Sequence, residues 1–228
     1  MVQVRTPFHA QKPFHALVDL DGTITDPRPG IIGSFRHALM EMGFEAPPAD
    51  DLLWVIGPPL RQSFPELGVP PGRIEEALAH YRRYYSAGAM FNAPVYAGIP
   101  AAFEAMRAAG VTLIVATSKP HVMARPILEH FGLDGHFHAI HGAELDGRND
   151  DKGDLLAHIL AEEGIDPARA VMIGDRKFDI LAARRHAIAN IGVLWGYGGA
   201  AELNEAGAGS LCAAPQDLAA MVEAARFR

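Results

Sequence analysis

Three aspartates stand close together directly after a short apolar stretch near the start of the chain. In LVDLDGTITD, residues 17–26, the carboxylates Asp19, Asp21 and Asp26 fall within eight residues. Carboxylates placed one residue apart repel each other unless a divalent cation neutralises them, and oxygen ligands of this kind suit Mg²⁺. Asp and Gly also favour ordinary turns, so this stretch alone leaves both interpretations open.

Three further groups of polar residues accompany later apolar stretches. Thr117, Ser118 and Lys119 follow VTLIVA, Lys152 opens KGDLLAHILAEEG, and Asp175 and Asp179 lie in IGDRKFD after AVMIG. Each group has an ordinary explanation, such as a helix cap or a solvated lysine. At one edge of one sheet, however, hydroxyl and ammonium groups would hold phosphate oxygens while carboxylates hold Mg²⁺. The set therefore predicts a phosphoryl-transfer site.

Strand and helix patterns alternate from residue 95 onward and predict the elements that position this site. Apolar runs rich in β-branched residues, the last of them weaker, occupy residues 111–116, 137–142, 170–174, 189–195 and 209–213. Amphipathic segments such as IPAAFEAMRAAG lie between them. Continuously apolar strands separated by helices indicate a parallel sheet covered on both faces. With LVDLD as its first strand, the body is predicted to be an α/β protein, an open, Rossmann-like three-layer sandwich.

Residues 27–94 interrupt this alternation with helical patterns and clusters of prolines. We predict an inserted helical cap domain over residues 27–94, and an α/β core made of residues 1–26 and 95–228. Ligands of open α/β sheets bind beyond the carboxyl ends of the strands, so an insert at this point would cover such a site. In the cap sequence IGPPLRQSF, Arg61 is either a bidentate partner for a substrate carboxylate or second phosphate, or a solvated helix residue.

The composition of the 228-residue chain excludes several classes of function. Twenty Lys and Arg against 27 Asp and Glu give a net charge of −7, a poor balance for binding nucleic acid polymers or anionic membranes. We find no apolar run long enough to span a bilayer and expect no signal peptide. One cysteine, Cys212, allows no intrachain disulfide and fits a cytoplasmic protein. The oligomeric state leaves no mark in the sequence.

The motifs, in this order and spacing, resemble those of the haloacid dehalogenase superfamily. DLDGT, a strand ending at Thr117, then Lys152, and then GDRKFD resemble motifs one to four, and the helical insert resembles the cap between motifs one and two. Where that family often has Lys-Pro, this chain has Lys152-Gly153. PVYAGIPAAFEAMRAAGVTLIVATSKP and GDRKFDILAARRHAIANIGVLWGYG resemble the phosphoglycolate phosphatase group, which shades into cap-bearing 5′-nucleotidases.

The resemblance implies a role for each matched residue. Asp19 is the expected nucleophile, which attacks phosphorus to give an aspartyl-phosphate. Asp21 is the expected acid for the leaving alkoxide and then the base for water, while Thr117 and Lys152 stabilise the transferring phosphoryl group. Ser118 and Arg61 are further expected substrate contacts. The implied Mg²⁺ ligands are the Asp19 carboxylate, the Asp21 backbone carbonyl and Asp175, with Asp179 supporting Lys152 or a metal-bound water.

We therefore expect a Mg²⁺-dependent phosphomonoesterase that acts on a small phosphorylated metabolite, with 2-phosphoglycolate as the favoured substrate. The nearest alternative is a nucleoside 5′-monophosphate phosphatase. A small acid needs a tight cap pocket with a cation such as Arg61, whereas a nucleotide needs an aromatic or open cap face. A phosphosugar mutase on the same scaffold and a non-catalytic phospho-acceptor module are further alternatives. Such a module needs neither a cap nor a proton donor at Asp21.

Three histidines, His136, His138 and His141, alternate around FHAIHG and resemble a metal cluster. Strand alternation places His136 and His138 on one face of the predicted strand. Because no cysteine or further histidine is seen to complete a tetrahedral set, the sequence does not predict a metal site at these residues.

Overall fold

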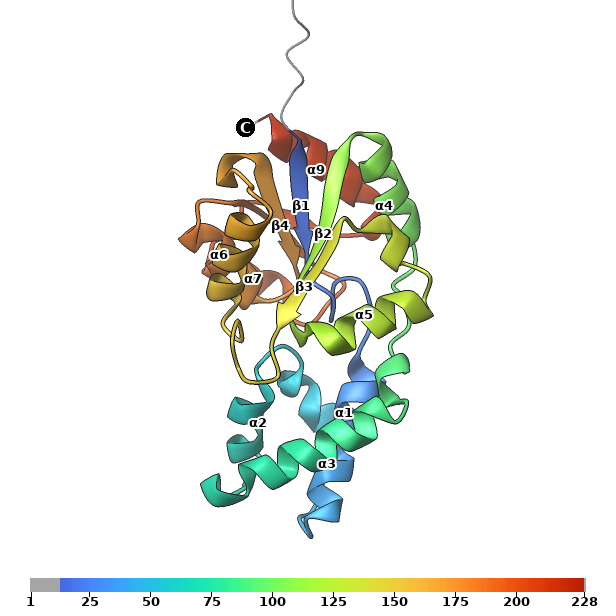
Figure 1. The fold of residues 1–228 in the computed structure, drawn as a ribbon, viewed down its shortest axis with the longest axis vertical. Helices are drawn as coiled ribbons and strands as arrows, with labels where there is room; N and C mark the ends of the chain where they lie inside the picture. Colours follow the sequence, from blue (N-terminus) through green and yellow to red (C-terminus); the bar gives the residue numbers. More distant parts are fainter. Residues whose placement is uncertain (1–12, 228) are drawn as a thin grey trace, which may run out of the picture.

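The computed structural model describes residues 13–227 and shows one parallel sheet with helices on both faces (Figure 1). The strand order is β3-β2-β1-β4-β5-β6, and every neighbouring pair is parallel. The strands are β1 (Phe14–Val18), β2 (Val111–Pro120), β3 (Ala139–Ala143), β4 (Ala170–Gly174), β5 (Ala189–Val193) and β6 (Leu211–Cys212). The predicted α/β fold with an open parallel sheet is confirmed.

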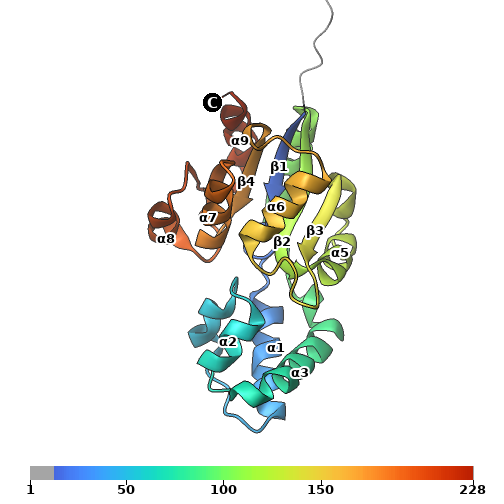
Figure 2. The ribbon, with the colours of Figure 1, turned by 60° about the vertical axis from the view of Figure 1, so that its left-hand side comes forward.

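The helices of the α/β body form a layer on each side of the sheet (Figures 1 and 2). One face is covered by α6 (Lys152–Glu162) and α7 (Lys177–Arg185). The other face is covered by α4 (Ile99–Ala108), α5 (His121–His130) and α9 (Leu218–Arg226). The remaining helix of the body, α8 (Gly199–Ala206), packs against α7.

The alternation of side chains along β1 explains why its sequence is apolar throughout. Ala16 and Val18 join the core beneath α4 and α5, whereas Leu17 joins a second core beneath α6 and α7. Ile114 and Met172, on the two neighbouring strands, belong to the same core as Leu17. Successive strand residues point to opposite faces, so a sheet covered on both sides needs an apolar residue at every position.

Five of these strands differ from their predicted bounds. β1 is Phe14–Val18 rather than LVDLD, and β5 ends at Val193 rather than at residue 195. The 3-10 helix η4 (Asp134–His136) precedes β3 and is closed by a hydrogen bond from the Phe137 N–H to the Asp134 carbonyl. The strand β3 therefore starts only at Ala139. The weak stretch 209–213 forms just the two-residue strand β6. The strand β2 runs on through Pro120, with a register shift against β3 between Thr117 and Pro120. Irregularities of this kind redirect side chains at a sheet edge.

A helical unit lies beyond the carboxyl ends of the strands (Figure 1). It contains α1 (Arg28–Glu41), α2 (Leu60–Glu66) and α3 (Ile74–Ser86), with short 3-10 turns between and after them. Its apolar centre is aromatic, because the ring of Phe35 lies 4.8 Å from that of Phe64 and 5.0 Å from that of Tyr81, centroid to centroid. We propose that residues 27–94 act as a cap on the α/β core.

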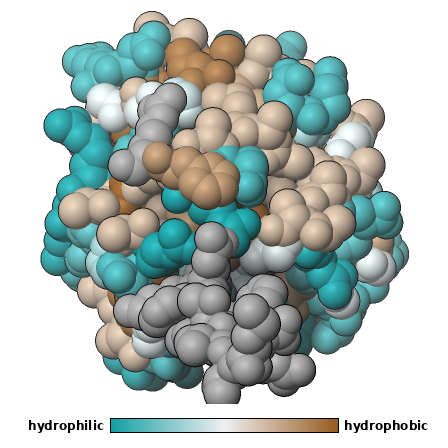
Figure 3. Space-filling model, turned by 90° about the horizontal axis from the view of Figure 1, so that it is seen from above, coloured by the Kyte–Doolittle hydropathy of each residue, from teal (hydrophilic) through white to brown (hydrophobic). Residues whose placement is uncertain are grey.

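The opposite end of the molecule has a mixed surface. Figure 3 looks onto this end, where hydrophilic and hydrophobic residues are interspersed on the visible face. Across residues 13–227, no helix has both the length and the apolar character needed to cross a membrane.

Candidate active site

The predicted polar residues lie at the carboxyl ends of three adjacent strands. Asp19 and Asp21 follow β1, Thr117 lies near the end of β2, and Asp175 follows β4. Because β1 lies between β2 and β4, these side chains meet at one edge of the sheet. The backbone N–H of Asp19 donates to the carbonyl of Ile173 (N···O 2.9 Å), and this bond anchors the loop after β1 to β4.

Lys152 reaches the same edge from the first residue of α6, and its ammonium group joins two carboxylates. Its Nζ lies 2.7 Å from Asp19 Oδ1 and 2.9 Å from Asp179 Oδ1, and the residue is 6% exposed. Burial alone would lower the pKa of Lys152, but the charges of Asp179 and Asp19 outweigh burial and raise this pKa. Lys152 is therefore a fixed positive charge within a group of acids.

The start of α6 is well formed with Gly153 at its second position. Asp151 is the N-cap residue, and its Oδ1 accepts a hydrogen bond from the backbone N–H of Asp154 at 3.0 Å. Glycine also leaves needed space, because a Cβ at position 153 would lie 2.6 Å from Arg185 Nη1. The departure from Lys-Pro therefore leaves the helix that carries Lys152 intact.

Asp19, Asp175 and Asp179 form a buried group in which one carboxylate oxygen from each residue lies within 4.8 Å of the others. Burial raises the pKa of Asp175 well above its ordinary value, and the charges of Asp179 and Asp19 raise it further. Burial also raises the pKa of Asp179 to about 6, against the opposing charge of Lys152. Such crowded carboxylates repel one another, and their oxygens fit a hard divalent cation such as Mg²⁺.

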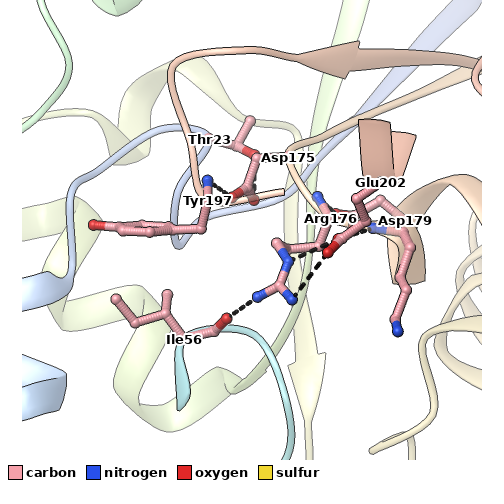
Figure 4. A network of polar contacts seen from close by, with 8 residues as sticks. Thr23, Ile56, Asp175, Arg176, Asp179, Tyr197 and Glu202 are labelled. Carbon is pink, nitrogen blue, oxygen red and sulfur yellow. Dashed lines mark hydrogen bonds and ion pairs between the residues drawn. The ribbon is translucent and has the colours of Figure 1, made fainter. Parts of the chain in front are cut away.

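Two loops close tightly around Asp175 (Figure 4). Its Oδ2 accepts a hydrogen bond from the backbone N–H of Tyr197 at 2.8 Å, and its Oδ1 accepts a longer one from the Thr23 hydroxyl at 3.4 Å. A Cβ on Gly22 would lie 2.3 Å from Asp175 Oδ2, and a Cβ on Gly196 would lie 2.3 Å from Asp175 Cβ. Gly22 also has φ +84°, so the close approach and the backbone both require glycine there.

The carboxylate of Asp21 pairs with Lys119, which the sequence placed at this edge with Thr117 and Ser118 but without a role of its own. Asp21 Oδ2 lies 2.7 Å from Lys119 Nζ, which also donates to the Tyr85 hydroxyl on α3. Burial raises the pKa of Asp21, and Lys119 opposes this shift. The position of Lys119 directly after Thr117 and Ser118 indicated that it lies at this edge of the sheet. The metal role predicted for Asp21 belongs to its backbone carbonyl, and this pairing leaves that prediction untouched.

A cavity of about 1120 Å³, its open mouth included, lies between the strand ends and the helical unit. The wall formed by the α/β body contains six of the predicted residues, namely Asp19, Asp21, Thr117, Ser118, Lys152 and Asp179. Thr117 is buried, and its Oγ1 accepts a hydrogen bond from the backbone N–H of Lys119 at 3.1 Å. Asp175 is fully buried and is not among the residues that line the cavity.

The opposite wall of the cavity comes from the helical unit. It is largely apolar and includes Leu60, Leu78, Tyr81 and Tyr85. Arg61 lines the cavity as predicted, but its guanidinium group forms two hydrogen bonds with Glu75, one of them 3.2 Å long. Both side chains are well exposed, at 48% for Arg61 and 72% for Glu75. The guanidinium group of Arg61 is therefore engaged by a neighbour and remains accessible to water.

Arg176, for which the sequence predicted no role, links the α/β body to the helical unit (Figure 4). Its Nε donates to Glu202 Oε1 at 2.9 Å, and its Nη1 donates to the carbonyl of Ile56 in the loop before α2. Its backbone N–H donates to Asp179 Oδ2 at 3.1 Å. Arg176 therefore holds Asp179, the acid that contacts Lys152, and at the same time contacts the helical unit.

Comparison with known proteins gives a family and several relatives. Residues 16–193 match the family model described as haloacid dehalogenase-like hydrolase. The chain is 45% identical over 206 residues to a 5′-nucleotidase of Pseudomonas aeruginosa, and the aligned residues cover 90% of this chain and 92% of that protein. It is 43% identical over 188 residues to the tyrosine-protein kinase PtkA of Mycobacterium tuberculosis, covering 82% of this chain and 64% of PtkA.

Two further likenesses point to phosphatases. The chain is 33% identical to a phosphoglycolate phosphatase of Agrobacterium fabrum over 80% of this chain and 81% of that protein. Among solved structures, a predicted phosphatase from Clostridium acetobutylicum has a TM-score of 0.88 and 36% identity, covering 93% of this chain and 99% of that one. The family match spans the strands that carry the clustered acids, so the chain belongs to the haloacid dehalogenase-like hydrolases and is a phosphatase of that family.

Proposed function

We propose that this protein is a Mg²⁺-dependent phosphomonoesterase that works through a phosphorylated Asp19. The observation that carries the proposal is the ammonium group of Lys152, which bridges the carboxylates of Asp19 and Asp179 at the floor of the cavity. This arrangement keeps a carboxylate nucleophile beside the cation that a transferring phosphoryl group needs.

The reaction has two displacements at phosphorus. In the first, an Asp19 oxygen forms a bond to phosphorus while the ester P–O bond breaks, and the leaving alkoxide takes a proton from Asp21. In the second, water attacks the aspartyl-phosphate, gives a proton to Asp21 and releases inorganic phosphate with Asp19 restored. Lys152 and the Thr117 hydroxyl hold the phosphoryl oxygens throughout, and Ser118 lines the same pocket.

Mg²⁺, when bound, supplies positive charge that the phosphoryl oxygens and the crowded acids both need. The residues that would hold it are Asp19, Asp175 and the backbone carbonyl of Asp21. Asp179, which contacts Lys152 and has a raised pKa, supports the position of the lysine. The burial and close spacing of these acids support this assignment.

For the substrate, we propose a nucleoside 5′-monophosphate as the first candidate. It takes precedence over 2-phosphoglycolate, the substrate that the sequence alone favours. The far wall of the cavity is apolar and aromatic, as a nucleoside requires. Arg61, the cation expected to hold a small acid, is paired with Glu75. The 45% identity to a 5′-nucleotidase over nearly the whole chain supports the same choice.

2-Phosphoglycolate remains the second candidate because Arg61 and Arg82 both line the cavity. The 33% identical phosphoglycolate phosphatase supports it. A phosphosugar mutase would use the same groups but return phosphate to a sugar. We also propose a cytoplasmic setting, in line with the single buried cysteine, Cys212.

The test is phosphate release from a panel of phosphomonoesters with Mg²⁺, compared by kcat/KM. The panel contains nucleoside 5′-monophosphates, 2-phosphoglycolate and hexose phosphates, with product analysis for sugar phosphates. We expect the highest kcat/KM for a nucleoside 5′-monophosphate. A higher value for 2-phosphoglycolate would establish the second candidate, and no phosphate release from any ester would refute the phosphomonoesterase itself.

A further inference from the structure

A second group of metal-ligating side chains lies away from the active site, between the edge strand β3 and the second half of α6. It consists of His141 on β3 and His158 and Glu162 on α6. One ligand atom from each of the three lies within 4.8 Å of the others. Figure 2 shows α6 lying across β2 and β3, so this contact is part of the packing of the helix on the sheet.

The helix supplies the ligands that the sequence analysis did not find. His158 and Glu162 are four residues apart and therefore lie on the same face of α6, where His158 Nε2 is 2.7 Å from Glu162 Oε2. The predicted pairing of His136 with His138 on one strand face is wrong, because His136 lies in η4. Its ring lies 5.9 Å from that of Phe103, in the other core.

A further carboxylate holds the histidine of the strand. Glu163 Oε1 is 2.7 Å from His141 Nε2, and its Oε2 is 3.3 Å from His138 Nε2. A carboxylate bonded to one ring nitrogen fixes the tautomer and orientation of a histidine that binds metal through the other nitrogen, and it raises the basicity of the ligand. Glu163 is thus placed either as this supporting group or as a fourth ligand.

We propose that His141, His158 and Glu162 form a binding site for a late first-row divalent cation, with Zn²⁺ as the ion that fits best. Two imidazole nitrogens and one carboxylate are a donor set typical of zinc, whereas Mg²⁺ prefers oxygen ligands alone. The two glutamates bring two negative charges against the two positive charges of the ion.

The ligand atoms need only a small adjustment to close on the ion. Tetrahedral bonds of about 2.0–2.2 Å place ligand atoms about 3.4 Å apart, which lies between the 2.7 Å that separates His158 Nε2 from Glu162 Oε2 and the present spread of up to 4.8 Å. The side chains of His158 and Glu162 are 47% and 55% exposed, so both can rotate inward without repacking the core.

This site is separate from the catalytic one but shares a helix with it. His158 lies six residues after Lys152, which is about 9 Å along the axis of α6. An ion bound here ties α6 to β3 and stabilises the folded chain without contacting the cavity. Its chemistry is structural, and phosphate release does not require it.

The test uses untagged protein saturated with Mg²⁺, so that the all-oxygen site is occupied, and titrates Zn²⁺ by calorimetry. Co²⁺ serves as a spectroscopic probe, whose visible absorption reports nitrogen ligands. We expect one Zn²⁺ per chain, a higher melting temperature with Zn²⁺, and binding weakened about 10–100-fold in His158→Ala and in Glu162→Gln. Both residues are half exposed, so the variants should fold and keep Mg²⁺-dependent phosphate release.

The matched control is His130→Ala, which removes another exposed histidine from α5, on the other face of the sheet. It should leave the Zn²⁺ affinity unchanged. The proposal is overturned if the wild-type protein binds no Zn²⁺ under these conditions. It is also overturned if the affinity is equal in wild type and in both variants, or if excess Mg²⁺ displaces the bound Zn²⁺.

Discussion

The two walls of the cavity are built in opposite ways. On the α/β side, Asp19, Lys152 and Asp179 are buried and locked to each other by contacts of 2.7 and 2.9 Å. On the helical side, the charged pair Arg61–Glu75 is exposed. Buried charges keep one geometry because leaving a partner is costly, whereas exposed pairs exchange readily with water. We infer that the α/β wall fixes the chemistry and that the helical wall is free to select the substrate.

The largest expected effect is that of Asp19→Asn. An amide is a poor nucleophile and a weaker metal ligand, so we expect kcat to fall on the order of 10⁴–10⁶-fold, as for nucleophiles elsewhere. Steady-state phosphate release from the best ester measures the loss. Retention of a tenth of the activity would show that the chemistry does not depend on this wall as proposed.

Removal of divalent metal should abolish turnover reversibly. Excess EDTA removes the cation that offsets repulsion among the crowded acids, and added Mg²⁺ should restore the rate. The same chelation should leave the ring contacts of the helical unit intact, which near-UV circular dichroism can follow. Full turnover in excess EDTA would show that the reaction does not require a divalent metal.

Asp21→Asn should reduce turnover without abolishing metal binding. Asparagine keeps the backbone carbonyl but cannot exchange a proton, so we expect a loss of about 10²–10⁴-fold with an alkyl phosphate. An aryl phosphate with a good leaving group needs less protonation, so its first step should suffer less. A near-normal rate with the alkyl ester would eliminate the acid–base role.

Arg61→Ala should have the smallest effect, and one that depends on substrate. Exposed charge contacts are weak, so we expect about a two- to fivefold rise in KM for an acidic substrate and little change in kcat. The matched variant Glu75→Gln frees the guanidinium group and should leave KM unchanged or lower it. A large fall in kcat in Arg61→Ala would contradict the division between the two walls.

Much of the site was predictable because strand period and parallel topology determine which residues share an edge. Asp19, Thr117 and Asp175 meet for that reason, since each follows or ends a strand of the same sheet. The contacts of Lys119 with Tyr85 and of Arg176 with Ile56 were not predicted, because Tyr85 and Ile56 come from the helical unit. Docking of two units separated by many residues leaves no periodic signal in either.

Contacts between distant segments also explain why the group of His141, His158 and Glu162 was not predicted. His141 was noticed, but His158 and Glu162 join it only because α6 folds back over β3. Strand alternation placed His136 and His138 on one face instead, and that prediction is wrong because the strand begins three residues after His136. The sequence predicted that a strand exists here but not its first residue. That residue is determined by the turn that closes η4, and the facing of His136 depends on it.

The central claim is that Asp19 carries the phosphoryl group between two displacements. Stereochemistry at phosphorus tests it most directly, with a phosphate monoester made chiral by oxygen isotopes and turned over with Mg²⁺. Two in-line displacements each invert the configuration, so the account predicts overall retention in the transferred phosphoryl group. Overall inversion would mean that water attacks the ester directly, and Asp19 would then not be the nucleophile.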